Sequence, residues 1–281
     1  MSAYDGLGPP ALPRRILDGL RLRASSRLDR VISVGDGSEA ALRFRVRSVH
    51  EYDRATNAMH NEPGTLRWIR ASVRPGDVFY DVGANVGLFA LVAAHRAGPT
   101  GRVIAFEPHV ATVEALLQNI SLNVLGERID VVSSALHSVS GHRPFLYRSL
   151  AAASGLSQVD ATSDPHGQDV APVARELKAV AAADDLIAGA TIPPADVVKI
   201  DVDGNEGAVL AGMRGLLTGP HRPRSLQVEV NPQGRDELLE SMSSAGYRET
   251  ERHLTIGSRR ALRDGADPES LGVNVLFEPS A

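Results

Sequence analysis

Residues 77–87 decide the fold of this chain, and their sequence is Asp-Val-Phe-Tyr-Asp-Val-Gly-Ala-Asn-Val-Gly. A strand-like apolar run leads to Asp81 and then to a turn that contains Gly83 and Gly87, and the apolar segment 86–97 is typical of a helix. Glycine is needed where the backbone takes unusual dihedral angles or comes close to a ligand. A strand, a glycine turn and a helix in this order predict a nucleotide pocket at the first crossover of a doubly wound sheet.

Two carboxylates indicate which nucleotide this pocket binds. The glycine spacing differs from the Gly-x-Gly-x-x-Gly of dinucleotide sites, and Asp81 at the strand end would repel a pyrophosphate. The same carboxylate suits the ammonium group of S-adenosylmethionine (SAM), which also carries a sulfonium and has no phosphate. Glu107 ends a second strand-like run, about 20 residues beyond the turn, where a carboxylate can accept hydrogen bonds from both ribose hydroxyls. The sequence therefore favours SAM over NAD.

The composition is that of an ordinary globular protein, with 281 residues, 43% of them hydrophobic and 23% charged. A net charge of -4 argues against a broad nucleic-acid-binding surface, so no nucleic-acid partner is expected. The absence of cysteine excludes disulfides and thiolate metal sites. No apolar run reaches membrane-spanning length and the N-terminus lacks the apolar core of a signal peptide, so we expect a cytoplasmic protein.

The first 62 residues are expected to form an N-terminal extension, and residues 63–281 are expected to form the domain that binds SAM. The extension comprises a flexible lead, a basic helix and a hairpin within residues 31–50. Thr65 is a plausible N-cap for the first helix of the domain. Glu62, which precedes that helix, either faces the ligand or is an ordinary capping or ion-paired residue, and the sequence leaves both interpretations open.

From residue 77 onward, strand-like and helical segments alternate regularly. We expect strands at 102–107, 129–136, 196–202 and 225–230, an extra strand at 142–150, and helices after Pro108, at 182–187, after Glu206 and at 235–245. Two final strands, 247–254 and 273–277, should pair antiparallel, and the polar segment 154–172 should be a mobile loop over the substrate. The predicted fold class is α/β, with a doubly wound, mostly parallel seven-stranded Rossmann-like sheet, a C-terminal antiparallel hairpin and a small N-terminal extension.

Polar side chains follow the strand ends where a transferred group would lie. Methyl transfer to a hydroxyl needs alignment of the reactants and a group that takes the hydroxyl proton. The expected catalytic residues are Asp201, Glu206 and Glu229, and His109 and His60 are weaker candidates for the general base.

Lys199 lies in an otherwise apolar strand, so its ammonium must pair with a carboxylate. Such a pair either holds two strands together or belongs to the active site, and the sequence does not decide between these roles. Asp201, Glu229 and Asn231 have oxygen atoms that suit Mg²⁺. Their spacing does not show that they converge, so magnesium is an alternative that we do not favour, and no metal ligand is assigned.

Taken in order, these motifs resemble the FkbM-type methyltransferases. The matching motifs are Asp-Val-Gly-Ala-Asn-Val-Gly at 81–87, Ala-Phe-Glu-Pro-His at 105–109, Gln-Asn at 118–119, Ser-Ala-Leu at 134–136, Lys-Ile-Asp-Val-Asp-Gly-Asn-Glu at 199–206, Val-Leu-Ala-Gly at 209–212, and Glu229. The resemblance covers roughly residues 62–231. It implies a class I SAM-dependent methyltransferase that O-methylates a hydroxyl on a sugar or a secondary metabolite. Asp203 departs from the pattern, because such proteins more often have Glu there.

The resemblance also implies roles for individual residues. Asp81 and the glycine turn would surround the methionine part of SAM, Glu107 the ribose and Ala135 the adenine, while Asp201 would face the methyl group. The full set of expected cofactor contacts is Glu62, Asp81, Gly83, Ala84, Asn85, Gly87, Glu107, Pro108, Ser134 and Ala135.

Two other functions stay open at this point. An NAD-dependent oxidoreductase could use a similar sheet, although Asp81 and the missing third glycine argue against it. A SAM-binding subunit without turnover is the second alternative, and the intact acidic set at the strand ends argues against it. The expected partner is a small molecule with a hydroxyl group. The sequence determines neither its identity nor the oligomeric state.

Overall fold

The computed structural model describes residues 29–35, 41–160, 171–267 and 270–280. The flexible lead and basic helix predicted before residue 29, and the central part of the loop predicted at 154–172, lie outside these described residues. Within the described residues, no helix has both the length and the apolar character needed to span a membrane.

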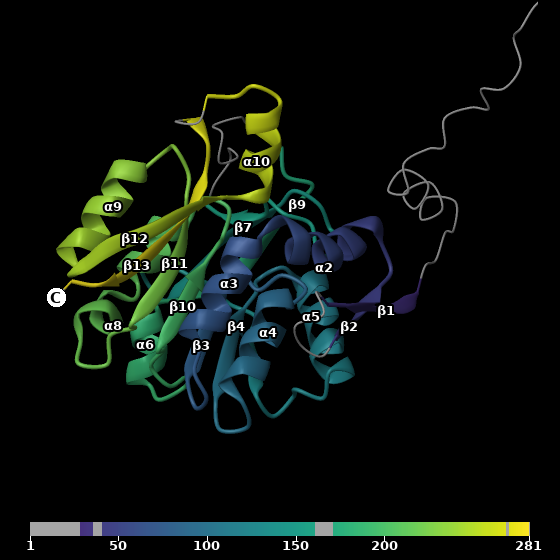
Figure 1. Ribbon diagram of the computed structural model, residues 1–281, viewed down its shortest axis with the longest axis horizontal. Helices are drawn as coiled ribbons and strands as arrows, with labels where there is room; N and C mark the ends of the chain where they lie inside the picture. Colours follow the sequence, from purple (N-terminus) through teal and green to yellow (C-terminus); the bar gives the residue numbers. More distant parts are fainter. Residues whose placement is uncertain (1–28, 36–40, 161–170, 268–269, 281) are drawn as a thin grey trace, which may run out of the picture.

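A seven-stranded sheet forms the centre of the molecule (Figure 1), in the order β12-β13-β11-β10-β3-β4-β5. The strands are β3 (Val78–Val82), β4 (Arg102–Phe106), β5 (Ile129–Val132), β10 (Val197–Ile200), β11 (Ser225–Val230), β12 (Tyr247–Leu254) and β13 (Val273–Pro279). The strands β3, β4, β5, β10 and β11 run parallel, and β13 is antiparallel to both β11 and β12. The predicted α/β class, with a mostly parallel sheet and a C-terminal antiparallel pair, is confirmed.

Helices cover both faces of this sheet because the central strands are apolar on both sides. In β3, Phe79 packs into one apolar cluster and Tyr80 into another, as the alternation of strand side chains requires. The first cluster includes α3 (Pro63–Ser72), α4 (Leu88–Ala97) and α5 (Val110–Leu122). The second includes α6 (Ala183–Ala188), α7 (Glu206–Ala211), α8 (Arg214–Thr218) and α9 (Arg235–Ser244).

The N-terminal hairpin forms as predicted, from β1 (Arg30–Val34) and β2 (Leu42–Val46), which pair antiparallel. Its inward side chains, including Phe44 and Val46, are buried in the cluster that contains α4 and α5. The helix α2 (Val49–Asn61) follows and was not predicted from its polar sequence. The hairpin therefore packs directly on the helices of the central sheet.

Asn119 on α5 joins the hairpin to the glycine turn. Its side-chain Oδ1 accepts a hydrogen bond from the Arg45 backbone nitrogen at 2.9 Å, and its Nδ2 donates to the Val86 carbonyl at 2.9 Å. The side chain is almost fully buried. A buried polar group costs free energy unless it is bonded, so this amide fixes β2 against the turn that follows β3.

Two predicted strand and cap assignments are wrong. The strand predicted at 129–136 is two strands, because the chain bends at Ser134 and β6 (Ala135–Leu136) leaves the central sheet. β6 belongs to a second, four-stranded sheet with β9 (Ala174–Ala181), β7 (Gly141–Tyr147) and β8 (Gln158–Val159), in that order. Thr65 is not an N-cap, because α3 begins at Pro63 with Glu62 as the capping residue.

The helix predicted after Glu206 is broken into α7 and α8 at Gly212. A Cβ at Gly212 would lie 1.9 Å from the carbonyl oxygen of His137, which follows β6. Only glycine therefore allows the backbone at residue 212 to come this close to the end of β6. The strand β9 and the helix α10 (Ile256–Arg263), which connects β12 to β13, were not predicted, whereas the extra strand near 142–150 appears as β7.

We expect Asn119→Ala to lower the free energy of unfolding by about 1–3 kcal/mol, because two backbone groups lose a buried partner. Chemical denaturation of the purified variant measures this change. Ser121→Ala, at an exposed position of the same helix, is the matched control and should stay within about 0.5 kcal/mol of the parent protein. Equal stability of both variants would contradict the bridging role of Asn119.

Candidate functional site

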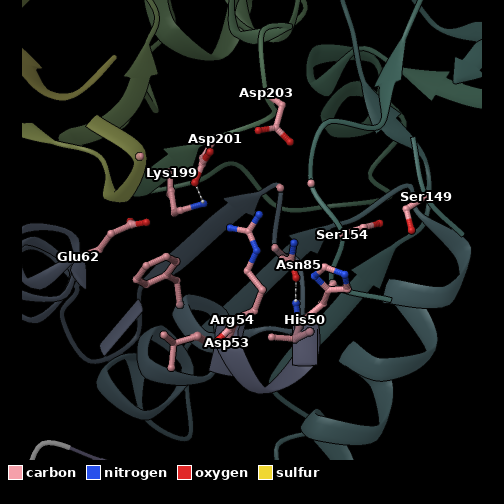
Figure 2. Close-up of a pocket in the computed structure, with 18 of the residues that line it drawn as sticks. His50, Asp53, Arg54, Glu62, Asn85, Ser149, Ser154, Lys199, Asp201 and Asp203 are labelled. Atoms are coloured by element: carbon pink, nitrogen blue, oxygen red, sulfur yellow. Dashed lines mark hydrogen bonds and ion pairs between the residues drawn. The ribbon is translucent and has the colours of Figure 1, made fainter. Parts of the chain in front are cut away.

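A cavity of about 600 Å³ lies at the carboxyl ends of β3 and β10, between the glycine turn, α2 and the segment 148–155. Its walls include His50, Asp53, Arg54, Glu62, Gly83, Ala84, Asn85, Val86, Phe89, Ser149, Ser154, Lys199, Asp201 and Asp203. Figure 2 shows Glu62, Lys199 and Asp201 on one side and Ser149 and Ser154 on the other, with Arg54 pointing between them. In parallel α/β sheets, ligands bind at this edge.

Two positions of the turn must be glycine because a side chain there would clash with neighbouring residues. Gly83 has a φ of +81°, and a Cβ there would lie 1.9 Å from the Asp201 carbonyl oxygen. Gly87 has a φ of +95°, and its Cβ would lie 2.5 Å from Cδ1 of Leu116. Gly83, Ala84 and Asn85 line the large cavity, whereas Gly87 does not. The turn therefore brings three of its four predicted cofactor contacts to the cavity wall.

Glu107 is buried behind this turn. Its Oε2 accepts from the Asn85 backbone nitrogen and its Oε1 from the His109 backbone nitrogen, both at 2.9 Å. Burial raises the pKa of Glu107 to about 7, although these two bonds favour the charged form. A carboxylate has about four lone-pair positions, so acceptor capacity remains beyond the two backbone bonds. Glu107 does not line the large cavity itself.

His109 is the N-cap of α5, and its ring is engaged on both sides. Nδ1 lies 3.1 Å from the Thr112 hydroxyl oxygen, and Nε2 lies 2.9 Å from the Ser149 carbonyl oxygen. Through these contacts His109 holds the segment 148–155, which forms one wall of the cavity. His60, the other weak candidate for the base, has a side chain outside the described set.

Three other predicted cofactor contacts, Pro108, Ser134 and Ala135, do not line the large cavity. Pro108 and Ala135 line a separate space of only about 40 Å³, together with Gly83 and with Gln158 and Val159 of β8. This volume is far below the roughly 300–1,000 Å³ of ligand pockets. Ser134 is half-buried and lines none of the three cavities found in the described residues.

Lys199 is at the centre of the charged groups, and its side chain is 1% exposed. Its Nζ lies 3.3 Å from Oδ1 of Asp81, its neighbour in the parallel register of β10 and β3, and 3.4 Å from Oδ2 of Asp201. The ammonium also lies 5.2 Å from the centre of the Phe89 ring. Burial alone would lower the pKa of Lys199, but the charges of Asp201 and Asp81 outweigh it and the pKa is raised.

The pKa values of Asp201 and Glu229 are shifted in opposite directions. Burial acts to raise the pKa of Asp201, but the Lys199 charge and a hydrogen bond from Glu229 lower it below its ordinary value. Burial and the negative charge of Asp201 raise the pKa of Glu229 well above its ordinary value. Of these two hydrogen-bonded carboxyl groups, Glu229 therefore holds a proton more tightly than Asp201.

Glu62 faces the same space, so its side chain lies on the cavity wall as well as next to a helix terminus. Its Oε2 accepts from the Thr65 hydroxyl at 3.3 Å. Burial and the nearby Asp201 charge raise the pKa of Glu62 to about 7. This places a third carboxyl group, poised to titrate near neutrality, beside Lys199 and Asp201.

Glu206 supports a turn and lies apart from the cavities of the described residues. Its Oε1 accepts from the backbone nitrogens of Val202 at 3.2 Å and Gly204 at 3.0 Å. This turn contains Asp203, with a φ of +57°, and its Oδ2 accepts from the Leu156 backbone nitrogen at 2.7 Å. Burial raises the pKa of Glu206 to about 7. These contacts place Glu206 behind Asp201 and Asp203.

The sequence indicated neither the helix α2 nor the three residues His50, Asp53 and Arg54 that it carries to the cavity. The polar character of residues 50–62 was visible, but no periodic apolar face marked the segment as a helix. The structure also shows no group of three or more histidines and carboxylates suited to a metal ion anywhere in the described ranges.

The strand order, the helices on both faces and the cavity at the strand ends define the Rossmann-like fold of class I SAM-dependent methyltransferases. The family model described as "Methyltransferase FkbM domain" matches residues 81–249. The chain belongs to this family and is a SAM-dependent methyltransferase of the FkbM type.

Two relatives that are methyltransferases by name agree with this assignment. Hexuronic acid methyltransferase AglP from Haloferax volcanii is 31% identical over 184 residues, which are 66% of this chain and 69% of AglP. The 31-O-demethyl-FK506 methyltransferase FkbM from Streptomyces tacrolimicus is 31% identical over 161 residues, 50% of this chain and 61% of the relative. The solved structure of methyltransferase FkbM from Methylobacillus flagellatus KT has a TM-score of 0.45 and 14% identity, covering 82% of this chain and 62% of that one.

We expect Glu206→Gln to fold and to gain stability relative to the parent protein as the pH rises. The folded-state pKa of about 7 lies above the unfolded value of 4.5, so ionisation of Glu206 costs stability progressively between these pH values. A glutamine keeps the accepting oxygen and removes the charge. The difference in unfolding free energy between variant and parent should therefore be larger at pH 8 than at pH 4.5, by at most about 3 kcal/mol.

Glu127→Gln, at an exposed position, is the control and should show no such pH dependence. Glu206→Ala removes the acceptor of two backbone nitrogens and should be less stable than Glu206→Gln at both pH values. If Glu206→Gln instead keeps its stability profile unchanged and loses methyl transfer, the catalytic role predicted from the sequence would be the better description.

Proposed function

We propose that this protein O-methylates a hydroxyl group on a sugar or a secondary metabolite, using SAM as the methyl donor. The observation that carries this proposal is the position of Asp201 on a cavity wall, with its Oδ2 3.4 Å from the Lys199 ammonium, which helps to hold its pKa below the ordinary value. The names of the two relatives support it, because one is a hexuronic acid methyltransferase and the other a 31-O-demethyl-FK506 methyltransferase.

The residues at the large cavity fit the cofactor. Its volume of about 600 Å³ is within the range of small-molecule pockets. Its wall carries both basic side chains and the carboxyl groups of Asp53, Glu62, Asp201 and Asp203, and these carboxyl groups suit a ligand with a sulfonium and an ammonium. Gly83, Ala84 and Asn85 would hold the methionine part, and Glu107 has acceptor capacity left for the ribose. When bound, SAM supplies an already activated methyl group, so positioning accounts for much of the rate enhancement.

Asp201 is the proposed general base. As the acceptor oxygen takes the methyl group, the O–H bond breaks and the proton passes to the Asp201 carboxylate. Lys199 keeps that carboxylate ionised before the reaction, and Glu229 steadies it through its hydrogen bond. Glu62 is the alternative base, because a pKa of about 7 suits proton transfer at neutral pH.

The position of Lys199 also suggests whether the reaction needs a magnesium ion. Its ammonium lies between Asp81 and Asp201, where a cation would otherwise balance the two carboxylates. We propose that transfer proceeds without magnesium, with Lys199 supplying the positive charge.

Asp201→Asn should leave the Kd for SAM nearly unchanged and lower turnover by about 10²–10⁴-fold, the usual contribution of a general base. Release of S-adenosylhomocysteine is measured with a panel of glycosides and macrolide alcohols, with and without magnesium. Asp130→Asn, an exposed surface change, is the control. Parent-level turnover in Asp201→Asn would transfer the role to Glu62, and a requirement for magnesium would contradict the metal-free mechanism.

Glu107→Ala should weaken SAM binding by about 1–3 kcal/mol, because backbone and ligand groups would lose a buried acceptor. Calorimetric titration with SAM measures this change, and a thermal melt verifies that the variant is folded. Unchanged affinity in a folded variant would remove Glu107 from the ribose site. Binding of NADH, seen by its fluorescence, in place of SAM would favour the oxidoreductase alternative, whereas SAM binding without turnover on any acceptor would favour a non-catalytic subunit.

A further inference from the structure

A second cavity, of about 290 Å³, lies on the other side of Asp201 from the glycine turn. It is formed by the ends of β11 and β13 and by α10, the helix at the top of Figure 1. Five residues line both cavities, namely Arg54, Glu62, Asp201, Asp203 and Gly257. The proposed base therefore lies at the junction of the two spaces, with access to both.

Two amide side chains in this second cavity have polar atoms that are not satisfied. Asn274 is 2% exposed, lies opposite Glu229 in the register of β11 and β13, and its Oδ1 has no hydrogen-bond partner among the described residues. Asn231 lies just past the end of β11, and its Nδ2 is also buried without a hydrogen-bond partner among the described residues. Native proteins rarely leave buried polar atoms unpaired, because each one costs free energy. Both side chains line the second cavity, so an acceptor oxygen and a donor nitrogen without protein partners belong to its wall.

The local backbone holds these amides in position. A Cβ at Gly272 would lie 2.8 Å from Oδ1 of Asn231, so the chain entering β13 comes close to that amide only because residue 272 is glycine. The Ser258 hydroxyl donates to the Gly272 carbonyl at 2.7 Å and fastens α10 to the same point. The arrangement is a built cavity wall in which both amides have defined neighbours.

We propose that the second cavity is the acceptor subsite and that Asn274 and Asn231 select a polyhydroxylated ring, that is, a sugar. Each sugar hydroxyl both donates and accepts, so neighbouring hydroxyls match one free amide oxygen and one free amide nitrogen. Leu156, Ala261 and Leu271 supply apolar surface for the ring face. An isolated hydroxyl on an apolar macrocycle would leave the amides unpaired. This inference rests on the proposed function and narrows its substrate class.

The test uses the full-length enzyme saturated with S-adenosylhomocysteine. Methyl α-D-glucopyranoside, methyl α-D-galactopyranoside and methyl α-D-mannopyranoside are the sugar probes, and 2-cyclohexylethanol is the apolar alcohol of similar size. Binding is detected by saturation-transfer NMR and quantified by titration. We expect at least one glycoside to bind and the cyclohexyl alcohol to bind more weakly.

Asn274→Leu and Asn231→Ala should each weaken glycoside binding by about tenfold or more, the equivalent of one lost hydrogen bond in this range. Both variants should keep the parental Kd for SAM. Two positions are tested because the buried Asn274 is the more demanding for folding. Glu278→Gln, an exposed change on the same strand, is the control and should match the parent in both measurements.

The subsite is refuted if SAM binds normally but no glycoside does, if the cyclohexyl alcohol binds as well as the sugars, or if both asparagine variants retain parental glycoside affinity. Parallel loss of SAM and glycoside binding in both variants would also refute it, because the asparagines would then serve the fold. Failure of the parent protein to bind SAM is a different result, since it refutes the proposed function itself.

Discussion

The active-site edge of this protein depends on a buried ammonium group. Lys199 is in a strand with neighbours on both sides, so its charge can be tolerated only if carboxylates reach it. Asp81 does so from β3 and Asp201 from the end of β10 itself. Burial acts to raise the pKa of Asp201, but the Lys199 charge and the hydrogen bond from Glu229 lower it, whereas burial and the charge of Asp201 raise the pKa of the next carboxyl group, Glu229. The charge of this one ammonium thus acts on the pKa values of several carboxyl groups at the active-site edge.

The central sheet was predictable because its strands are short apolar runs that end in glycine or carboxylate motifs. The segments at 225–230 and 247–254 match β11 and β12 at both ends. The errors arose where tertiary contacts override local pattern. The bend at Ser134 sends β6 into another sheet, and the contact of Gly212 with His137 interrupts a continuous apolar stripe. Neither contact leaves a signal in the neighbouring residues.

The site was predictable to a similar degree. Motif position and the alternation of strand side chains placed Lys199 and Asp201 at one edge of the sheet, and the structure adds the distances between them. Glu206 belongs to the same motif, yet its oxygen is bonded to the turn, a distinction that depends on rotamer and not on sequence spacing. Arg54 was missed because α2 reaches the cavity only through the docking of the hairpin and α3.

The position of α10 has a consequence for how substrate preference changes in such a fold. This helix is an insertion between two strands whose pairing already fixes both of its ends. Because the entropy of closing a loop grows slowly with its length, residues can be added or lost there at little cost to stability. The glycine turn and the Lys199 pair lie on other strands and stay untouched by such changes. Exchange of this one connection between family members would therefore change the wall of the proposed acceptor subsite and leave the glycine turn and the Lys199 pair in place.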